Sequence, residues 1–159
     1  MLLLSAPASA IKPGPPIAPA LDLYKENTYW ASYADYVARR LDVDYLVGNN
    51  GAITAYDVLI LSTETGSGAS CQAFLYPPGP TNYPPGPNQW PHGPCHGALG
   101  TLVPGSTLGF TLVYDVPEAT GSFSAVIHGS AQDDAGATYS YPDCDTCLNP
   151  QPLPPAPVG

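Results

Sequence analysis

The chain has 159 residues, of which 13 are acidic and only 4 are basic, so its formal net charge at pH 7 is −9. Hydrophobic residues make up 44% of the chain and charged residues 11%, a composition too apolar and too weakly charged for an intrinsically disordered protein. The cations are Lys12, Lys25, Arg39 and Arg40, so residues 41–159 offer no basic cluster for binding nucleic acid or an anionic membrane.

Residues 1–20 are predicted to form an N-terminal arm outside the folded domain. Residues 1–10 contain three consecutive leucines and end in Ala-Ser-Ala, which resembles the small-residue site of a secretory signal peptide. They are either part of such a signal or a retained tail. Residues 11–20 hold four prolines, which a central strand does not tolerate. The resemblance to a secretory signal predicts an exported protein. No apolar run is long enough to span a bilayer, so we expect that the protein does not span the membrane.

A β-rich domain is predicted over residues 21–143. Over residues 41–47, Leu41, Val43, Tyr45 and Val47 share one face while Asp42 and Asp44 point to the other, which is typical of a half-buried strand. Residues 48–51 supply turn-forming glycine and asparagine, and residues 55–61 give a second strand, so the two are predicted to pair as a hairpin. Residues 29–40 could form a short amphipathic helix, but their aromatic and β-branched content favours a long, bent strand.

A proline-rich insertion interrupts the domain at residues 76–97. It contains the pentapeptide Tyr-Pro-Pro-Gly-Pro twice, seven residues apart, and this period does not fit collagen. We expect a loop of polyproline II character. Strand patterns return at residues 98–103, 107–116, 122–131 and 137–141.

These elements predict an all-β fold, an antiparallel Ig-like β-sandwich of seven to eight strands. Proline-rich N- and C-terminal arms and the loop insertion would be added to it. The C-terminal arm is residues 144–159, which begin with Cys-x-x-Cys and continue rich in proline. The expected core residues are Val43, Tyr45, Val47, Val58, Ile60, Phe110, Leu112 and Tyr114.

The middle of the chain also resembles a known group of families. Residues 41–58 are LDVDYLVGNNGAITAYDV and residues 100–117 are GTLVPGSTLGFTLVYDVP. Both stretches are similar to the Ig-like repeats of prokaryotic surface proteins of the CARDB and DUF11 type. These repeats have a strand ending in Asn-x-Gly and a Pro-Gly turn before the next strand. The resemblance spans about residues 37–141 and implies the fold more than a function.

Four cysteines in an exported chain predict two disulfides, for which three pairings exist. Local pairing is the simplest. A Cys71–Cys95 bond would clamp the proline-rich insertion, and a Cys144–Cys147 bond would hold the start of the C-terminal arm. The alternative use of Cys144 and Cys147 in a redox or haem motif is less well supported, because no histidine follows Cys147.

Metal binding and catalysis are weakly supported. His92 and His96 flank one cysteine and could join it and Cys71 as metal ligands, but their spacing matches no common zinc module. Carboxylates that could bind calcium fit solvated turns better; they are Asp133, Asp134, Asp143 and Asp145. His128 lies in a strand pattern, and no nucleophile elbow or phosphate loop occurs. We expect no catalytic residue, metal or cofactor.

Two classes of function remain. The first is a non-catalytic structural subunit of an extracellular filament or surface assembly, whose partners are copies of itself. The second is a monomeric cell-surface module that binds or adheres to other surface proteins or glycans. An aromatic cluster could bind sugar, although such residues more often fill a core or an interface; it comprises Tyr24, Tyr29, Trp30, Tyr33 and Tyr36. The low charge and proline-rich arms favour self-assembly through apolar arm residues, namely Leu2, Leu3, Leu4, Ile11, Ile17, Leu153 and Val158.

Overall fold

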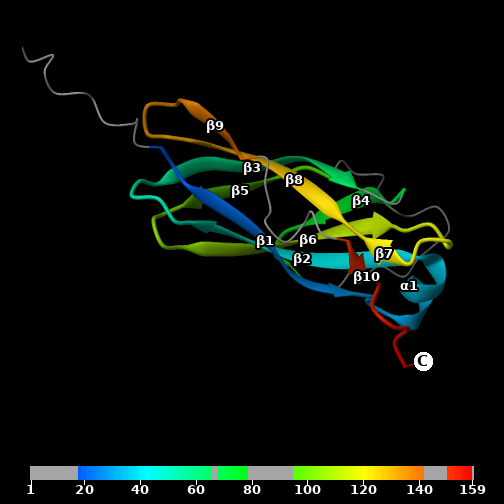
Figure 1. Cartoon of the computed structure of the whole chain (residues 1–159). Coiled ribbons are helices and arrows are strands. Elements are labelled where there is room, and N and C mark those ends of the chain that lie inside the picture. The colour runs from blue at the N-terminus through cyan, green and yellow to red at the C-terminus, as the bar shows by residue number, and fades with distance from the viewer. Residues whose placement is uncertain (1–17, 66–67, 79–94, 142–149, 159) are drawn as a thin grey trace, which may run out of the picture.

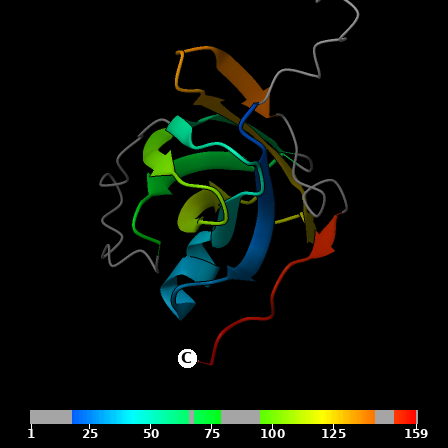
Figure 2. The same ribbon diagram turned by 90° about the vertical axis from the view of Figure 1, so that its left-hand side faces the viewer.

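Most strands of the domain belong to two four-stranded antiparallel sheets that pack face to face (Figures 1 and 2). They are seen in a computed structural model that describes residues 18–65, 68–78, 95–141 and 150–158. The first sheet, in spatial order, contains β1 (Leu21–Tyr29), β2 (Arg40–Asn49), β6 (Thr107–Asp115) and β4 (Ser70–Leu75). The second contains β5 (Gly97–Leu102), β3 (Ala55–Thr65), β8 (Ala125–Gln132) and β9 (Thr138–Tyr141). The predicted all-β sandwich is therefore confirmed.

A short two-stranded sheet supplements the sandwich. Its strands are β7 (Ser122–Phe123) and β10 (Gln151–Pro152), and the second of these belongs to the C-terminal arm. A strand was not expected there because proline lacks the N–H that a ladder uses. Here Pro152 forms the end of a two-residue pairing with β7, a position where a missing donor is tolerated.

The core lies between the two sheets, and all eight predicted core residues are at most 1% exposed. Tyr45 stacks on Phe110 with ring centroids 5.5 Å apart. The hydroxyl groups of Tyr45 and Tyr114 lie 3.2 Å apart and share a hydrogen bond, so neither buried hydroxyl lacks a partner. Burial raises the pKa of Tyr45 well above its ordinary value, and burial raises the pKa of Tyr114 to about 12.

The predicted hairpin between residues 41–47 and 55–61 is wrong. β2 pairs with β1 and β6, whereas β3 pairs with β5 and β8 in the other sheet. The glycine and asparagine residues at 48–51 therefore carry the chain across the sandwich. Asn49 is fully buried at this crossing: its Nδ2 donates to the carbonyls of Ile53 at 2.8 Å and Leu102 at 3.0 Å, and its Oδ1 accepts from the Gly51 N–H at 3.0 Å.

The long strand predicted for residues 29–40 is also wrong. β1 ends at Tyr29, and a short helix, α1, spans Tyr33–Ala38. Ser32 caps its first turn, since its Oγ accepts a hydrogen bond from the Asp35 N–H at 3.1 Å. Arg39 ends the helix in the left-handed conformation, with φ 61°. The two caps stabilise a helix that residue propensities alone do not favour.

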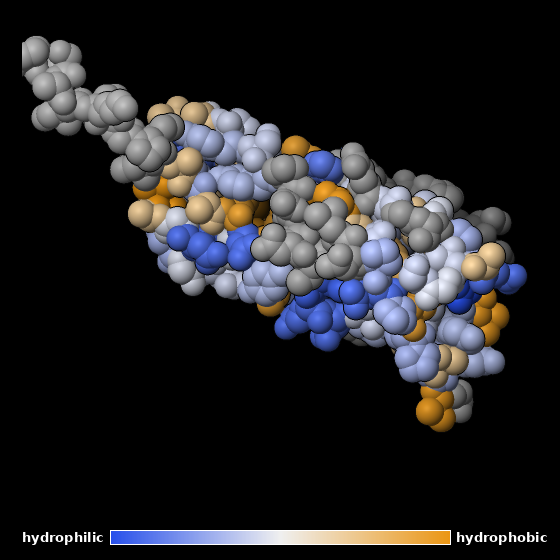
Figure 3. Space-filling view, viewed as in Figure 1, coloured by the Kyte–Doolittle hydropathy of each residue, from blue (hydrophilic) through white to orange (hydrophobic). Residues whose placement is uncertain are grey.

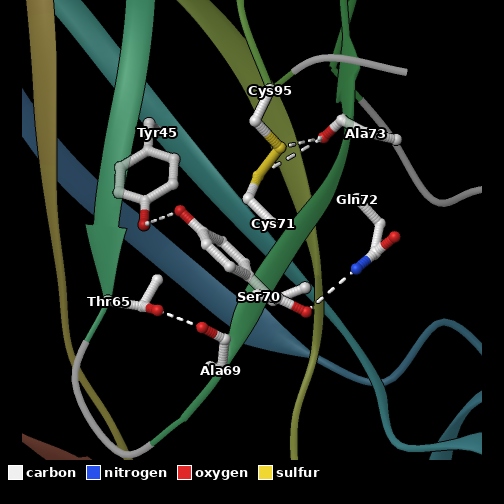
Figure 4. The surroundings of a disulfide bond; sticks show 9 residues. Tyr45, Thr65, Ala69, Ser70, Cys71, Gln72, Ala73 and Cys95 are labelled. Carbon is white, nitrogen blue, oxygen red and sulfur yellow. Dashed lines mark hydrogen bonds between the residues drawn. A yellow bond between two sulfur atoms is a disulfide. The ribbon is translucent and has the colours of Figure 1, made fainter. Parts of the chain in front are cut away.

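The Cys71–Cys95 disulfide is present and joins the two sheets (Figure 4). Cys71 lies in β4, at the edge of the first sheet, and Cys95 precedes β5, at the edge of the second. The Cα atoms of the two cysteines are 5.8 Å apart. The bond closes a loop with a sequence separation of 24, which stabilises the fold by about 3.5 kcal/mol in the chain-entropy estimate.

Candidate assembly surfaces

Several loops meet at one end of the sandwich, which we call the Asn49 end. The Asn49 N–H donates to the Ser106 carbonyl at 3.0 Å, and the Asn50 N–H donates to the Ala20 carbonyl at 2.8 Å. The hydroxyl of Tyr141 also donates to the carbonyl of Pro19. These bonds fix the place where the first described residues join the domain, at the left of Figure 1.

The Asn49 end carries carboxylates. Asp22 lies at the start of β1, Asp57 near the start of β3, and Asp133 and Asp134 in the turn between β8 and β9. The turn holds Asp133 firmly, because its Oδ1 accepts backbone N–H groups of residues 135 and 137 at 2.9 Å and its Oδ2 accepts the Tyr139 hydroxyl at 3.1 Å. Asp133 therefore acts as a turn residue, which agrees with the interpretation of these aspartates as turn carboxylates rather than calcium ligands.

The opposite end, which we call the α1 end, is organised around Trp30. Trp30 is 6% exposed, and Tyr36 packs edge-on against it with ring centroids 5.5 Å apart. The guanidinium carbon of Arg39 lies 5.3 Å from the centre of the indole ring, within the range of a cation–π contact. Arg39 Nη2 also donates to the carbonyls of Thr120 at 3.0 Å and Pro117 at 3.2 Å. The indole is thus held in one orientation by α1 and by the loop that follows β6.

The C-terminal segment, residues 150–158, lies at the α1 end on its own domain (Figures 1 and 2). β10 pairs with β7, the Leu153 N–H donates to the Gly121 carbonyl at 3.2 Å, and Trp30 Nε1 donates to the Pro154 carbonyl at 2.8 Å. Leu153 is half-buried against the core, whereas Val158 is fully exposed. The other arm residues expected to self-associate fall outside the described residues; they are Leu2, Leu3, Leu4, Ile11 and Ile17.

The predicted aromatic cluster is divided between the interior and the surface. Trp30 is buried and Tyr36 half-buried, so they belong to the packing of the α1 end. Tyr29 donates from its hydroxyl to Asp44 Oδ1 at 3.3 Å, and partial burial together with that carboxylate raises its pKa. Tyr33 is 52% exposed. The cluster therefore does not form one open aromatic platform of the kind that stacks on a sugar.

Sequence reasoning missed the contact between Trp30 and the C-terminal segment. It also missed α1, which the capping pattern Ser32-x-x-Asp35 could have indicated. The contact with Pro154 joins residues 124 positions apart, and no local pattern predicts such a pair.

The remaining candidate ligands of the sequence do not gather into a site. In the second sheet, His128 is half-buried within β8. His96 is exposed beside a shallow groove of about 430 Å³, which Leu61 and Ala98 also line. No group of three His, Cys, Asp or Glu side chains among the described residues could hold a metal ion. His92, Cys144, Cys147, Asp143 and Asp145 lie outside those residues.

Within the described part of the chain, no helix has the length and apolar character needed to cross a bilayer. No protein-family model matches the sequence, and no curated protein matches it either, so the resemblance to CARDB and DUF11 repeats stays a prediction.

Proposed function

We propose that the protein is a non-catalytic structural subunit of an extracellular surface assembly, in which copies join head to tail. The observation that carries this proposal is the difference between the two ends of the sandwich. The described chain begins at the Asn49 end and finishes at the α1 end (Figure 1). A contact between unlike ends repeats from one subunit to the next and produces a filament if it does not close into a ring.

Charge disfavours contact between two Asn49 ends. In the described residues both arginines, Arg39 and Arg40, lie at the α1 end, together with the acidic residues Asp35, Asp115 and Glu118. The Asn49 end carries the four aspartates described above. Two Asn49 ends placed together would therefore bring two sets of carboxylates into contact, and like charges at an interface cost free energy. A symmetric dimer through this end is disfavoured, while a head-to-tail contact is not.

Exposed apolar side chains supply surface that a neighbour could cover. On α1, Tyr33 is 52% exposed and Val37 is 60% exposed, and their i, i+4 spacing places them on one side of the helix. In Figure 3 the apolar colour at this end gathers over α1 and at the tip of the C-terminal segment. Val103, at the Asn49 end, is 56% exposed. Both ends thus offer apolar area to a head-to-tail contact.

An extracellular location is supported by the disulfide between the sheets, since such bonds persist in oxidising compartments. The chain contains few lysines and glutamates, two residue types that are depleted at protein interfaces, and this composition fits a surface that contacts other subunits.

Negative-stain microscopy of the purified chain tests the proposal, with fibres as the expected result. Val37→Glu should abolish the fibres, because it places a charge in the proposed contact. Ala98→Glu, an exposed change in β5 at the middle of the sandwich, where Ala98 pairs with Leu59, should leave them intact. A chain that stays monomeric at high concentration, by light scattering, would overturn the proposal in favour of a monomeric surface-binding module.

A second variant tests the N-terminal arm. Deletion of residues 1–17 should remove the fibres and leave a folded monomer. The deletion should stop there, because Pro19 and Ala20 are hydrogen-bonded to the domain. Fibres formed by the shortened chain would show that the arm is not the connector.

A further inference from the structure

The C-terminal segment meets Trp30 through a contact suited to proline. The acceptor of the indole N–H is the carbonyl oxygen of Pro154, at 2.8 Å, in the sequence Leu-Pro-Pro-Ala-Pro that spans residues 153–157. A polyproline II segment keeps its carbonyls free of internal hydrogen bonds, and it is already extended before it binds. Aromatic grooves that recognise proline-rich peptides use both properties.

The protein side of the contact is already arranged. Tyr36 packs against the edge of Trp30 and Arg39 lies over the indole ring, so the indole N–H keeps its direction when a ligand arrives. The Gly121 carbonyl accepts the Leu153 N–H at 3.2 Å, and Leu153 packs against the core beside it. One fixed donor, one fixed acceptor and one apolar contact together define the direction and register of the bound segment.

The attachment of the segment is small compared with the sheets of the sandwich. It includes a two-residue pairing with β7, the Leu153 and Pro154 hydrogen bonds and the partial burial of Leu153. Identical contacts would form if the segment came from another copy of the chain, and such an exchange costs little.

We propose that Trp30, Tyr36 and Arg39 form a binding site for a proline-rich segment. In the single chain the site holds the chain's own C-terminal segment. In the assembly it holds the same segment of a second copy, and this second statement rests on the proposed function. The segment then acts as a strap that links the α1 end of one subunit to its neighbour.

Tryptophan fluorescence of the full chain tests the binding site. Trp90→Phe leaves Trp30 as the only tryptophan, because the sequence contains two. Adding Leu153→Ser to this variant should loosen the segment and shift the emission of Trp30 to longer wavelength as the indole gains contact with water. Val158→Ser is the matched control, and it should not shift the emission because Val158 is fully exposed.

Added peptide should reverse the shift. A peptide with the sequence of residues 151–159 should restore the original emission of the Leu153→Ser chain. The same peptide carrying serine in place of leucine should bind at least about tenfold more weakly, as expected for loss of one buried apolar side chain. Unchanged emission in the Leu153→Ser chain, or no recovery at millimolar peptide, would overturn the binding site.

Isotope-resolved cross-linking tests the exchange and does not depend on the Leu153 variant. The full chain carries Ala156→p-benzoyl-phenylalanine, at an exposed position of the segment, and is prepared with light or heavy nitrogen. After irradiation, monomers should show only like-labelled cross-links to the peptide containing Trp30, that is, cross-links that join two light or two heavy peptides. Filaments grown from an equal mixture should also show unlike-labelled ones.

The outcomes separate the two proposals. Filaments that contain only like-labelled cross-links would refute the exchange and leave the assembly standing. If no filaments form but the peptide titration succeeds, the assembly fails and the proline-binding site stands.

Discussion

Replacing Asn49 with alanine tests how the chain is held where it crosses between the sheets. The substitution removes two donors and one acceptor, whose hydrogen bonds measure 2.8, 3.0 and 3.0 Å. Asn49 is fully buried, so the carbonyls of Ile53 and Leu102 and the N–H of Gly51 would lose their partners, and the Leu102 carbonyl would lose its partner in the interior. At about 1 kcal/mol for each bond, the free energy of unfolding should fall by about 3 kcal/mol.

Urea unfolding followed by circular dichroism measures this loss, and a midpoint lower by at least about 1 M is expected. The matched control is Asn50→Ala. Asn50 is exposed and its side chain donates only to Asp22 among the described residues, at 3.3 Å, so the change should cost less than about 0.5 kcal/mol. If Asn49→Ala costs less than about 1 kcal/mol, the three bonds do not hold the crossing and the reasoning fails.

Three further predictions concern the core and the link between the sheets. Phe110→Ala should lower the free energy of unfolding by about 3 to 5 kcal/mol, and a loss below about 1 kcal/mol would contradict its place in the core. Reduction of the Cys71–Cys95 bond should lower it by about 3.5 kcal/mol, and peptide mapping without reductant should recover these two cysteines linked. Burial raises the folded-state pKa values of Tyr45 and Tyr114 above 10.0, so at alkaline pH the folded protein keeps protons that the unfolded chain releases. The free energy of unfolding should therefore be at its full value below pH 10 and should fall as the pH rises towards 12. Tyr45→Phe should make that fall shallower by about 1.4 kcal/mol per pH unit, and an unchanged slope between pH 10 and 12 would refute the assignment.

The strand pattern of the sequence predicted the core well. In a strand, successive side chains point to opposite faces, so the alternation from residue 41 to residue 47 identified the inward face of β2 without knowledge of its partners. The same reasoning holds for Phe110, Leu112 and Tyr114 in β6. A period-two pattern can be recognised from one strand alone, because it depends on which face of that strand meets the core and not on which strands it pairs with.

Pairing and distant contacts could not be predicted in the same way. The glycine and asparagine residues at 48–51 are as suitable for a crossing between sheets as for a hairpin, and the difference depends on the distant Leu102 carbonyl that accepts from Asn49. α1 was missed because two caps, Ser32 and Arg39, outweigh the strand preference of its aromatic residues. The site at Trp30 depends on a segment more than a hundred residues away.

The direction of β1 has a mechanical consequence. β1 runs from the Asn49 end towards the α1 end and pairs with β2 from Leu21 to Tyr29 (Figure 1). A pull on the chain at Ala18, directed away from the α1 end, acts along the strand. The hydrogen bonds of an antiparallel pair lie across the strands, so such a pull shears all of them together instead of opening them one after another. Under tension carried from subunit to subunit, β1 would resist as one unit, and the small β7–β10 pairing at the other end would be the first to give way.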